Sequence, residues 1–256
     1  MRYAIRRAEK KKRMCTRYII ALIVALTGAC LLLYPKIDNM LYKNKVTAGK
    51  EAFLRKTRGI AVLAGAGHGD YENNDDFVPE LYEQLYQFLK AENERLSETG
   101  QDELTDAFSY QTAGIDLSAY GLDDGCVGYI EVPSIGVLLP IYLGANTENM
   151  KKGSVHMTQT SYPIGGGNTN AVIAAHRGGT REMLRNINKI QIGDEIIVTN
   201  FRERLVYRAM EARIILPTDI NEIKIQEGRD IITLLSCNPL GDNYQRYVLY
   251  CERIME

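Results

Sequence analysis

The stretch TLLSCNPLGDNYQR, residues 233–246, carries a cysteine and an arginine nine positions apart. The apolar run Ile231–Leu235 is typical of a buried strand, and the Asn-Pro and Gly-Asp-Asn sequences after Cys237 indicate a turn. A second strand then begins at Arg246. If the two strands are neighbours, Cys237, just past the end of the first, and Arg246 emerge at the same end of a sheet. A guanidinium placed there favours a thiolate and can donate hydrogen bonds to an oxyanion.

A histidine follows another apolar strand. The run AVIAA, residues 171–175, leads directly into His176 and a Gly-Gly turn. Catalytic groups are often mounted where a strand gives way to a loop, and an imidazole exchanges protons near neutral pH. Taken singly, each residue has a structural explanation: an inert buried thiol, a hydrogen-bonded histidine, a surface arginine. The three therefore form a hypothesis for one site, with Cys237 as nucleophile, His176 as proton-transfer group and Arg246 as charge stabiliser.

The region from residue 126 to residue 256 is predicted to be one mainly β domain of about 130 residues, a size usual for such folds. Its apolar runs are short, β-branched and bounded by Gly, Pro, Asn and Asp, as in a sandwich or barrel. A short helix is expected over Arg181–Ile190. The predicted strands are Gly128–Val132, Gly136–Tyr142, Asn170–Ala175, Glu195–Asn200, Leu205–Ile215, Asp230–Leu235 and Tyr247–Glu252.

The N-terminal segment predicts a membrane anchor. Residues 1–17 hold eight basic side chains and one acidic one, a charge of +7, and residues 18–34 (YIIALIVALTGACLLLY) hold no charge. That run is at the short end of what spans a bilayer, and the basic flank is expected in the cytoplasm, with residues 36–256 outside. A cleaved signal peptide and a lipoprotein at Cys30 fit less well, since small residues are missing after the run and the run continues past Cys30.

Residues 35–125 are predicted to be an extracellular helical and linker region. An amphipathic helix is expected over Phe77–Leu96, because Leu81, Leu85 and Leu89 recur every four residues. The Gly- and Asn-rich residues 65–76 before it indicate a loop.

Charge and cysteine content limit the function. The whole chain has a charge of −1, so the part after residue 17 carries −1 − 7 = −8. An acidic body argues against nucleic acid as a partner. Cys15 and Cys30 lie beside or in the anchor, and the part of the chain expected outside the cell holds three cysteines, Cys126, Cys237 and Cys251. Because three is an odd number, at least one of these thiols is unpaired. Whether Cys126 and Cys251 form a disulfide stays open. His68 and His156 are expected to be solvent-exposed, and no spacing suggests a metal site or a cofactor.

These motifs resemble the sortase family of cysteine transpeptidases. TLLSC followed by Arg246 is similar to the family's Thr-Leu-x-Thr/Ser-Cys signature and its arginine, and His176 in AVIAAHRGG matches the family's histidine. The resemblance runs from about Phe108 to Arg253. It implies an eight-stranded β-barrel. The stretches GYIEVPSIGVLLPIYLGA (128–145), GSVHMTQTSYPIGGGNTN (153–170) and IGDEIIV (192–198) resemble class C, the pilus-assembling sortases.

Class C sortases usually carry a lid with an Asp-Pro-aromatic motif before the barrel. Asp106-Ala107-Phe108 stands in that place, with alanine instead of proline. The resemblance implies that Asp106 pairs with Arg246 and that Phe108 shields Cys237. Losing the proline removes a backbone restraint, so a looser lid is expected; the alternative is a plain linker.

The resemblance also implies the reaction and the partners. The substrates would be secreted proteins with a Leu-Pro-x-Thr-Gly-like C-terminal sorting signal, cleaved through a thioacyl enzyme. The acceptor would be a pilin lysine, or a peptidoglycan amine if the protein anchors surface proteins to the cell wall. Hydrolysis, or a non-catalytic membrane-tethered binding domain, are the remaining alternatives.

Overall fold

The computed structural model describes residues 2–58, 80–102, 104, 114–122 and 124–254, with side chains from residue 16 on, except that of residue 58. The predicted loop over residues 65–76, with His68, lies outside the described residues. So do Asp106 and Phe108 of the predicted lid.

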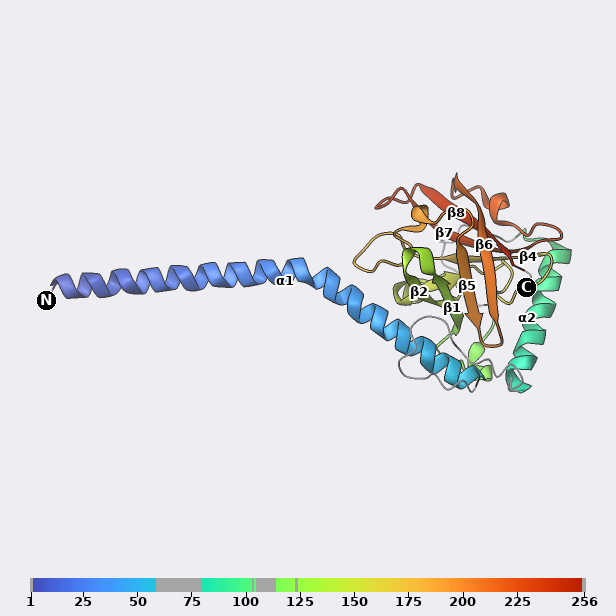
Figure 1. Cartoon of the computed structure of the whole chain (residues 1–256), viewed down its shortest axis with the longest axis horizontal. Coiled ribbons are helices and arrows are strands. Elements are labelled where there is room, and N and C mark those ends of the chain that lie inside the picture. The colour runs from blue at the N-terminus through green and yellow to red at the C-terminus, as the bar shows by residue number, and fades with distance from the viewer. Residues whose placement is uncertain (1, 59–79, 103, 105–113, 123, 255–256) are drawn as a thin grey trace.

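Eight strands close into a barrel in the order β1-β2-β3-β4-β7-β8-β6-β5, which confirms the predicted fold (Figure 1). Six of the eight pairings are antiparallel, and β2–β3 and β4–β7 are parallel. The strands are β1 Cys126–Val132, β2 Val137–Leu143, β3 Ser154–His156, β4 Thr169–Ala174, β5 Glu195–Asn200, β6 Arg204–Ile215, β7 Asp230–Asn238 and β8 Gln245–Arg253. The 3-10 turn η1 Leu117–Tyr120 precedes β1, and short elements connect the strands: the helix α3 Thr147–Lys152 and the 3-10 turns η2 Pro133–Ile135, η3 Ile187–Lys189 and η4 Ile220–Ile223.

The structure corrects two of the predicted elements. Strand β3 was missed, because three residues are too few to show a period of two. The expected helix over Arg181–Ile190 is instead a series of turns ending in η3. Asn186 and Asn188 favour turns over helix, and the apolar side chains of this stretch (Met183, Leu184, Ile187 and Ile190) are buried in the barrel core.

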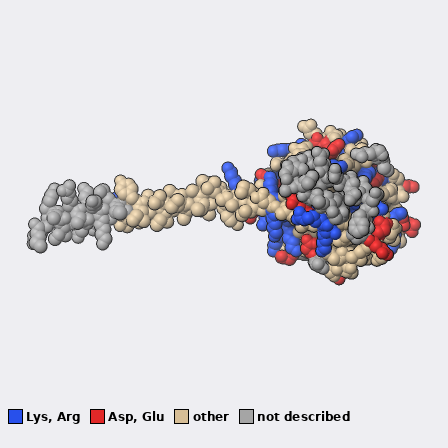
Figure 2. All heavy atoms as spheres, turned by 60° about the horizontal axis from the view of Figure 1, so that its bottom comes forward, with Lys and Arg blue, Asp and Glu red and all other residues tan. Residues whose placement is uncertain are grey.

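Helix α1, Arg2–Arg58, is longer than the predicted anchor and passes through Pro35 without ending. Within the described residues it is the one helix long and apolar enough to cross a membrane, with a mean hydropathy of 2.2 and none of its apolar window buried. In Figure 2, the tan stretch of α1 between its grey end and the body shows no Lys, Arg, Asp or Glu until it nears the body. Figure 1 shows it changing direction part-way along, as a proline inside a helix causes.

The C-terminal half of α1 belongs to the body of the protein. Phe53 packs edge-on against Tyr129 of β1, with ring centroids 5.5 Å apart. Lys50 is 5% exposed and forms an ion pair with Glu131. A Cβ at Gly49 would lie 2.9 Å from the Tyr129 hydroxyl, so a side chain there would have to displace the Tyr129 ring. The helix is thus fixed to the barrel wall.

An earlier turn of α1 holds the loop that follows β4. Asp38 accepts a hydrogen bond from the Thr180 hydroxyl at 2.9 Å and lies 3.5 Å from the Arg181 guanidinium. The Asn39 side chain accepts from the Glu182 amide at 3.1 Å. These contacts begin four residues after Tyr34, about 6 Å along the helix. The loop next to His176 therefore rests on the turn that follows the apolar segment.

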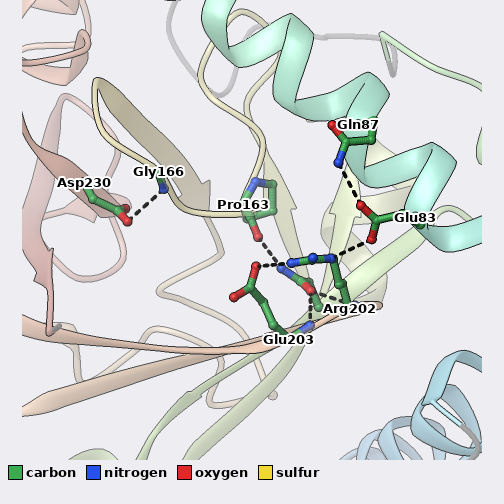
Figure 3. A network of polar contacts seen from close by, with 8 residues as sticks. Glu83, Gln87, Pro163, Gly166, Arg202, Glu203 and Asp230 are labelled. Atoms are coloured by element: carbon green, nitrogen blue, oxygen red, sulfur yellow. Dashed lines mark hydrogen bonds and ion pairs between the residues drawn. The ribbon is translucent and has the colours of Figure 1, made fainter. Parts of the chain in front are cut away.

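Helix α2, Glu80–Thr99, covers another side of the barrel, where Leu85 and Leu89 are fully buried. Figure 3 shows Glu83 accepting a hydrogen bond from Arg202 of the β5–β6 turn, at 3.0 Å, while Gln87 donates to its other oxygen. Asn93 is buried, accepts from the Tyr162 amide at 2.6 Å and donates to the Tyr162 carbonyl at 3.2 Å.

His156 was expected to be exposed, and this is wrong: it is 2% exposed. Its Nε2 lies 3.0 Å from the Ser161 carbonyl and 3.2 Å from the Thr160 carbonyl, and its ring stacks on Tyr162 at 5.0 Å. The missed strand β3 carries it into the wall between β2 and β4. Burial lowers the pKa of His156 to about 4, so it is a neutral structural histidine.

Replacing Asn93 should show how much its buried hydrogen bonds to Tyr162 contribute to stability. Asn93→Ala leaves the buried Tyr162 amide without its partner, which should lower the free energy of unfolding by about 1–3 kcal/mol. Gln87→Ala, on the exposed face of the same helix, is the matched control and should change it by less than about 0.5 kcal/mol. Chemical denaturation of the purified protein measures both; equal losses would contradict the docking role of Asn93.

His156 should make stability depend on pH. Its pKa is about 4 when folded and 6.5 when unfolded, so the unfolded state binds more protons between these values. Stability should therefore fall as pH drops through this window, by up to roughly 3 kcal/mol. His156→Gln keeps a side-chain donor and does not titrate, so the unfolding free energy measured against pH should lose this slope. An unchanged slope would assign the effect to other groups.

Candidate active site

The pairing of β7 with β8 sets Cys237 directly opposite Arg246. The sequence placed Cys237 just past the end of its strand, but β7 continues through Asn238, so both residues lie within the ladder. The expectation that they emerge at the same end of the sheet agrees with this register. Antiparallel partners have Cβ atoms roughly 5 Å apart on the same face.

The parallel pairing of β4 with β7 brings His176 level with Cys237. Ala174 is the partner of Leu235. Two contacts continue the alignment: the Ala175 amide donates to the Leu235 carbonyl at 3.2 Å, and the Ser236 hydroxyl donates to the Ala175 carbonyl at 2.7 Å. His176 and Cys237 each lie two residues beyond the Ala174–Leu235 pair. His176, Cys237 and Arg246 thus form a row across three neighbouring chain segments.

This row continues an apolar layer on the outer face of the barrel. Side chains alternate between the two faces of a strand, so Ala174, Leu235 and Val248, each two positions from a member of the row, lie on its face. These three residues share one buried cluster with Ile215 and Ile223. The alternate positions, such as Ile173, Leu234 and Leu249, belong to the other core cluster. The row therefore lies at the end of a buried apolar layer on the same face of the sheet.

The three side chains differ in exposure. Arg246 is 5% exposed, and its guanidinium donates to the carbonyls of Asn243 at 2.6 Å and Gln245 at 3.0 Å, so its own loop orients it. Cys237 is half-buried and His176 is exposed. Although His176 faces solvent on one side, the protein on its other side lowers its pKa by desolvation, which favours the neutral imidazole that can accept a proton.

The other thiols of the barrel are not suited to react. Cys126 and Cys251 are both free and buried, so the disulfide that the sequence left open is not formed. Burial raises the pKa of Cys126 to about 12 and that of Cys251 well above its usual value. A protonated, enclosed thiol is a poor nucleophile. Among the described cysteines of the barrel, only Cys237 is partly accessible.

The segment before the predicted lid docks on the same layer. Leu104 is 2% exposed and belongs to the cluster of Leu235 and Val248. Gln101 donates to the Gln159 carbonyl and accepts from the Ile225 amide, both at 2.7 Å. Asp106, two residues beyond Leu104, lies outside the described residues. In the part of the chain that the structure describes, no group of three His, Cys, Asp or Glu side chains could hold a metal ion.

Sequence reasoning missed one residue beside this row. Arg177 directly follows His176, is 6% exposed and donates to the Cys237 carbonyl at 3.3 Å. Adjacency to His176 was its only signal in the sequence, because an arginine in a glycine-rich loop is normally a solvated side chain.

Comparisons with known proteins agree on one family. The model of the Sortase domain matches residues 130–254. The structure of sortase C2 from pilus island 1 of Group B Streptococcus is 34% identical, with a TM-score of 0.63, and the match covers 70% of this chain and 100% of that one. Sortase C from Clostridium perfringens SM101 is 30% identical, with a TM-score of 0.58, over 71% of this chain and 94% of that one.

The curated relatives match over shorter regions. Sortase A of Listeria monocytogenes is 32% identical over 127 residues, which are 49% of this chain and 55% of that protein. The chain matches 63% of the length of sortase D of Bacillus subtilis. With the closed barrel and the family model in agreement, the chain belongs to the sortase family.

Proposed function

We propose that this chain is a membrane-anchored cysteine transpeptidase that transfers a sorting-signal peptide to an amine. The observation that carries the proposal is the row of His176, Cys237 and Arg246, which the strand register creates across β4, β7 and β8. A thiol flanked by an imidazole and a guanidinium has the parts that acyl transfer requires: nucleophile, proton-transfer group and oxyanion donor.

The first half of the reaction forms a thioacyl enzyme. The Cys237 thiol gives its proton to His176, its sulfur attacks the carbonyl carbon of the scissile peptide bond, and the carbonyl oxygen becomes an oxyanion within reach of the Arg246 guanidinium. The C–N bond then breaks, and His176 supplies the proton that the departing amine needs. The buried apolar layer formed by Leu235, Val248 and their neighbours supports the row from within the protein and excludes water from that side of the reacting groups.

The second half returns the enzyme to its starting state. An acceptor amine attacks the thioester carbon, His176 takes its proton, and the C–S bond breaks to release the Cys237 thiolate, which regains a proton from His176. The lowered pKa of His176 suits this step, because a neutral imidazole is present at neutral pH to act as the base. Water in place of the amine would give hydrolysis through the same intermediate.

The proposed arrangement in the membrane follows from α1. Residues 18–34 span the bilayer, the basic residues 1–17 stay in the cytoplasm, and residues 36–256 lie outside with the catalytic barrel at 126–256. The uncharged surface of the exposed part of α1 supports the span (Figure 2), and the basic flank supports the orientation. In this proposal the protein is anchored in the cell membrane and does not bind nucleic acid.

The proposed substrates are secreted proteins with a Leu-Pro-x-Thr-Gly-like signal, and the proposed acceptor is a lysine of a pilin subunit. Similar structures include sortases C1 and C2 from pilus island 1 and a pilus-related sortase C, all of Group B Streptococcus. That similarity favours pilus assembly over attachment to a peptidoglycan amine. The lid residues Asp106 and Phe108 stay a prediction, which the docking of nearby Leu104 on the outer layer supports.

A thiol reagent should modify Cys237 long before the other barrel cysteines. Iodoacetamide added to the folded protein at neutral pH should label Cys237 first, because Cys126 and Cys251 are buried and their pKa values are raised. Peptide mass spectrometry of a time course measures the three rates. Labelling at equal rates would remove the case for an activated nucleophile.

Transfer itself should depend on Cys237 and Arg246. With a sorting-signal peptide and an amine acceptor, Arg246→Lys should lower kcat by about 10²–10³-fold, since a single ammonium replaces the planar donor. Cys237→Ala should form no thioacyl adduct. Chromatography and mass spectrometry of the products, with a pilin lysine peptide and a peptidoglycan cross-bridge peptide compared as acceptors, separate transfer, hydrolysis and the two amines. An adduct that still forms in Cys237→Ala would refute the mechanism.

A further inference from the structure

Arg177 is a buried arginine that contacts the proposed catalytic row and the residues beside it. One guanidinium nitrogen, Nη1, donates to the Asn238 side-chain oxygen at 2.7 Å and to the Cys237 carbonyl at 3.3 Å. Its Nε donates to the Arg185 carbonyl at 3.4 Å, and its guanidinium carbon lies 5.5 Å from the centroid of the Tyr247 ring. None of the ion pairs among the described residues includes Arg177.

The contacts of Arg177 continue across the sheet as a second row. Asn238 is the register partner of Gln245, and its Nδ2 donates to the Gln245 side-chain oxygen at 3.2 Å. The hydrogen-bonded chain Arg177–Asn238–Gln245 therefore crosses the end of β4, then β7, then β8. Each member is the immediate sequence neighbour of one residue of the first row, so the chain links the backbone on which His176, Cys237 and Arg246 stand.

The two rows use opposite faces of the same sheet. Neighbouring residues of a strand point to opposite sides, so Asn238 and Gln245 point away from the face that carries Cys237 and Arg246. Tyr247, over which Arg177 stacks, packs against the core cluster that lies on this second side. Arg177 thus closes the end of the barrel beneath the reacting groups.

Burying a guanidinium costs free energy unless its donors are satisfied. Here carbonyl oxygens and one amide oxygen satisfy it. Because arginine has donors only, the oxygen of the Asn238 amide must face Arg177 and its nitrogen must face Gln245, which fixes the direction of the whole chain. The hydrogen bonds between Arg177, Asn238 and Gln245 lie at the last pair of the β7–β8 ladder. Because strand ends readily open, these bonds stabilise the ladder next to Cys237 and Arg246.

We infer that Arg177 is a positioning residue: its guanidinium fixes the Cys237 backbone and, through Asn238 and Gln245, the start of the strand that carries Arg246. The inference rests on the proposed function, since it concerns the geometry of the same site. A residue with only a structural role would lower stability and leave turnover per folded molecule unchanged. A positioning residue lowers kcat while leaving substrate binding nearly intact.

The test uses the full chain in detergent micelles or nanodiscs, with Arg177→Gln, Arg177→Lys and Asn238→Asp compared with the unmodified protein. We expect Arg177→Gln to lower kcat by about 10- to 100-fold with KM changed by less than about 3-fold, because small displacements of reacting groups cost up to about 10²-fold. Arg177→Lys should recover part of the loss, since an ammonium still donates but lacks the fork. Asn238→Asp keeps the acceptor for Arg177 and loses the donor to Gln245, so kcat should also fall.

Arg181→Gln is the matched control. Arg181 lies four residues further along the same loop and contacts Asp38 of α1 and the Lys151 carbonyl, away from the row. Arg181→Gln should leave kcat within about 2-fold, as expected of a substitution without contact to the reacting groups.

Iodoacetamide labelling of Cys237 gives a readout without substrate, and labelling should slow in Arg177→Gln and stay unchanged in Arg181→Gln. Thermal unfolding ensures that all rates refer to folded protein.

The outcomes separate this inference from the proposed function. If the unmodified protein labels at Cys237 and transfers peptide, but Arg177→Gln matches its kcat and labelling rate, the positioning role is wrong and the transpeptidase stands. If the unmodified protein neither labels nor transfers, the proposed function itself fails. Should Arg177→Gln not fold, Asn238→Asp and Arg177→Lys still decide, since unchanged kcat in both would overturn the inference.

Discussion

The register of three strands is the constraint on which the rest of the site depends. Parallel pairing of β4 with β7 and antiparallel pairing of β7 with β8 bring the end of β4, some 60 residues earlier in the chain, level with Cys237 and Arg246 of the β7–β8 pair. A shift of one residue in either ladder would turn a side chain of the row to the opposite face, because strand side chains alternate. The register is itself held by packing: Ala174, Leu235 and Val248 are each fully buried in the outer layer.

The apolar helix α1 contacts the barrel domain through the loop that follows β4. Asp38 and Asn39 of α1 hold residues 180–182, and further along the helix Lys50 and Phe53 are fixed to β1. The continuous helix leaves no flexible linker between its apolar part and the barrel. The loop that starts at His176 therefore has two supports, the barrel core through Leu184 and the first polar turn of α1.

The sequence predicted most of the barrel and the residues of the row, for identifiable reasons. Seven strands have four or more residues with apolar or alternating patterns, so their periodicity is visible, while the three-residue β3 has none. The error on His156 follows from that omission, since a histidine in an unrecognised strand was assigned to a loop. Likewise, the buried Asn93 cannot be told from an exposed asparagine without its partner Tyr162, which lies 69 residues away in the chain.

The sequence by itself determined the apolar segment, the alternation of the strands and the residue types at the ends of β4, β7 and β8, because each of these is a local property of the chain. The tertiary structure alone decided that His176 stands level with Cys237, that the two remaining barrel thiols are enclosed, and that Arg177 bonds to Cys237 and Asn238. Those facts arise from contacts between segments some 60 residues apart. Their geometry is set by the closure of the barrel, which no local pattern encodes.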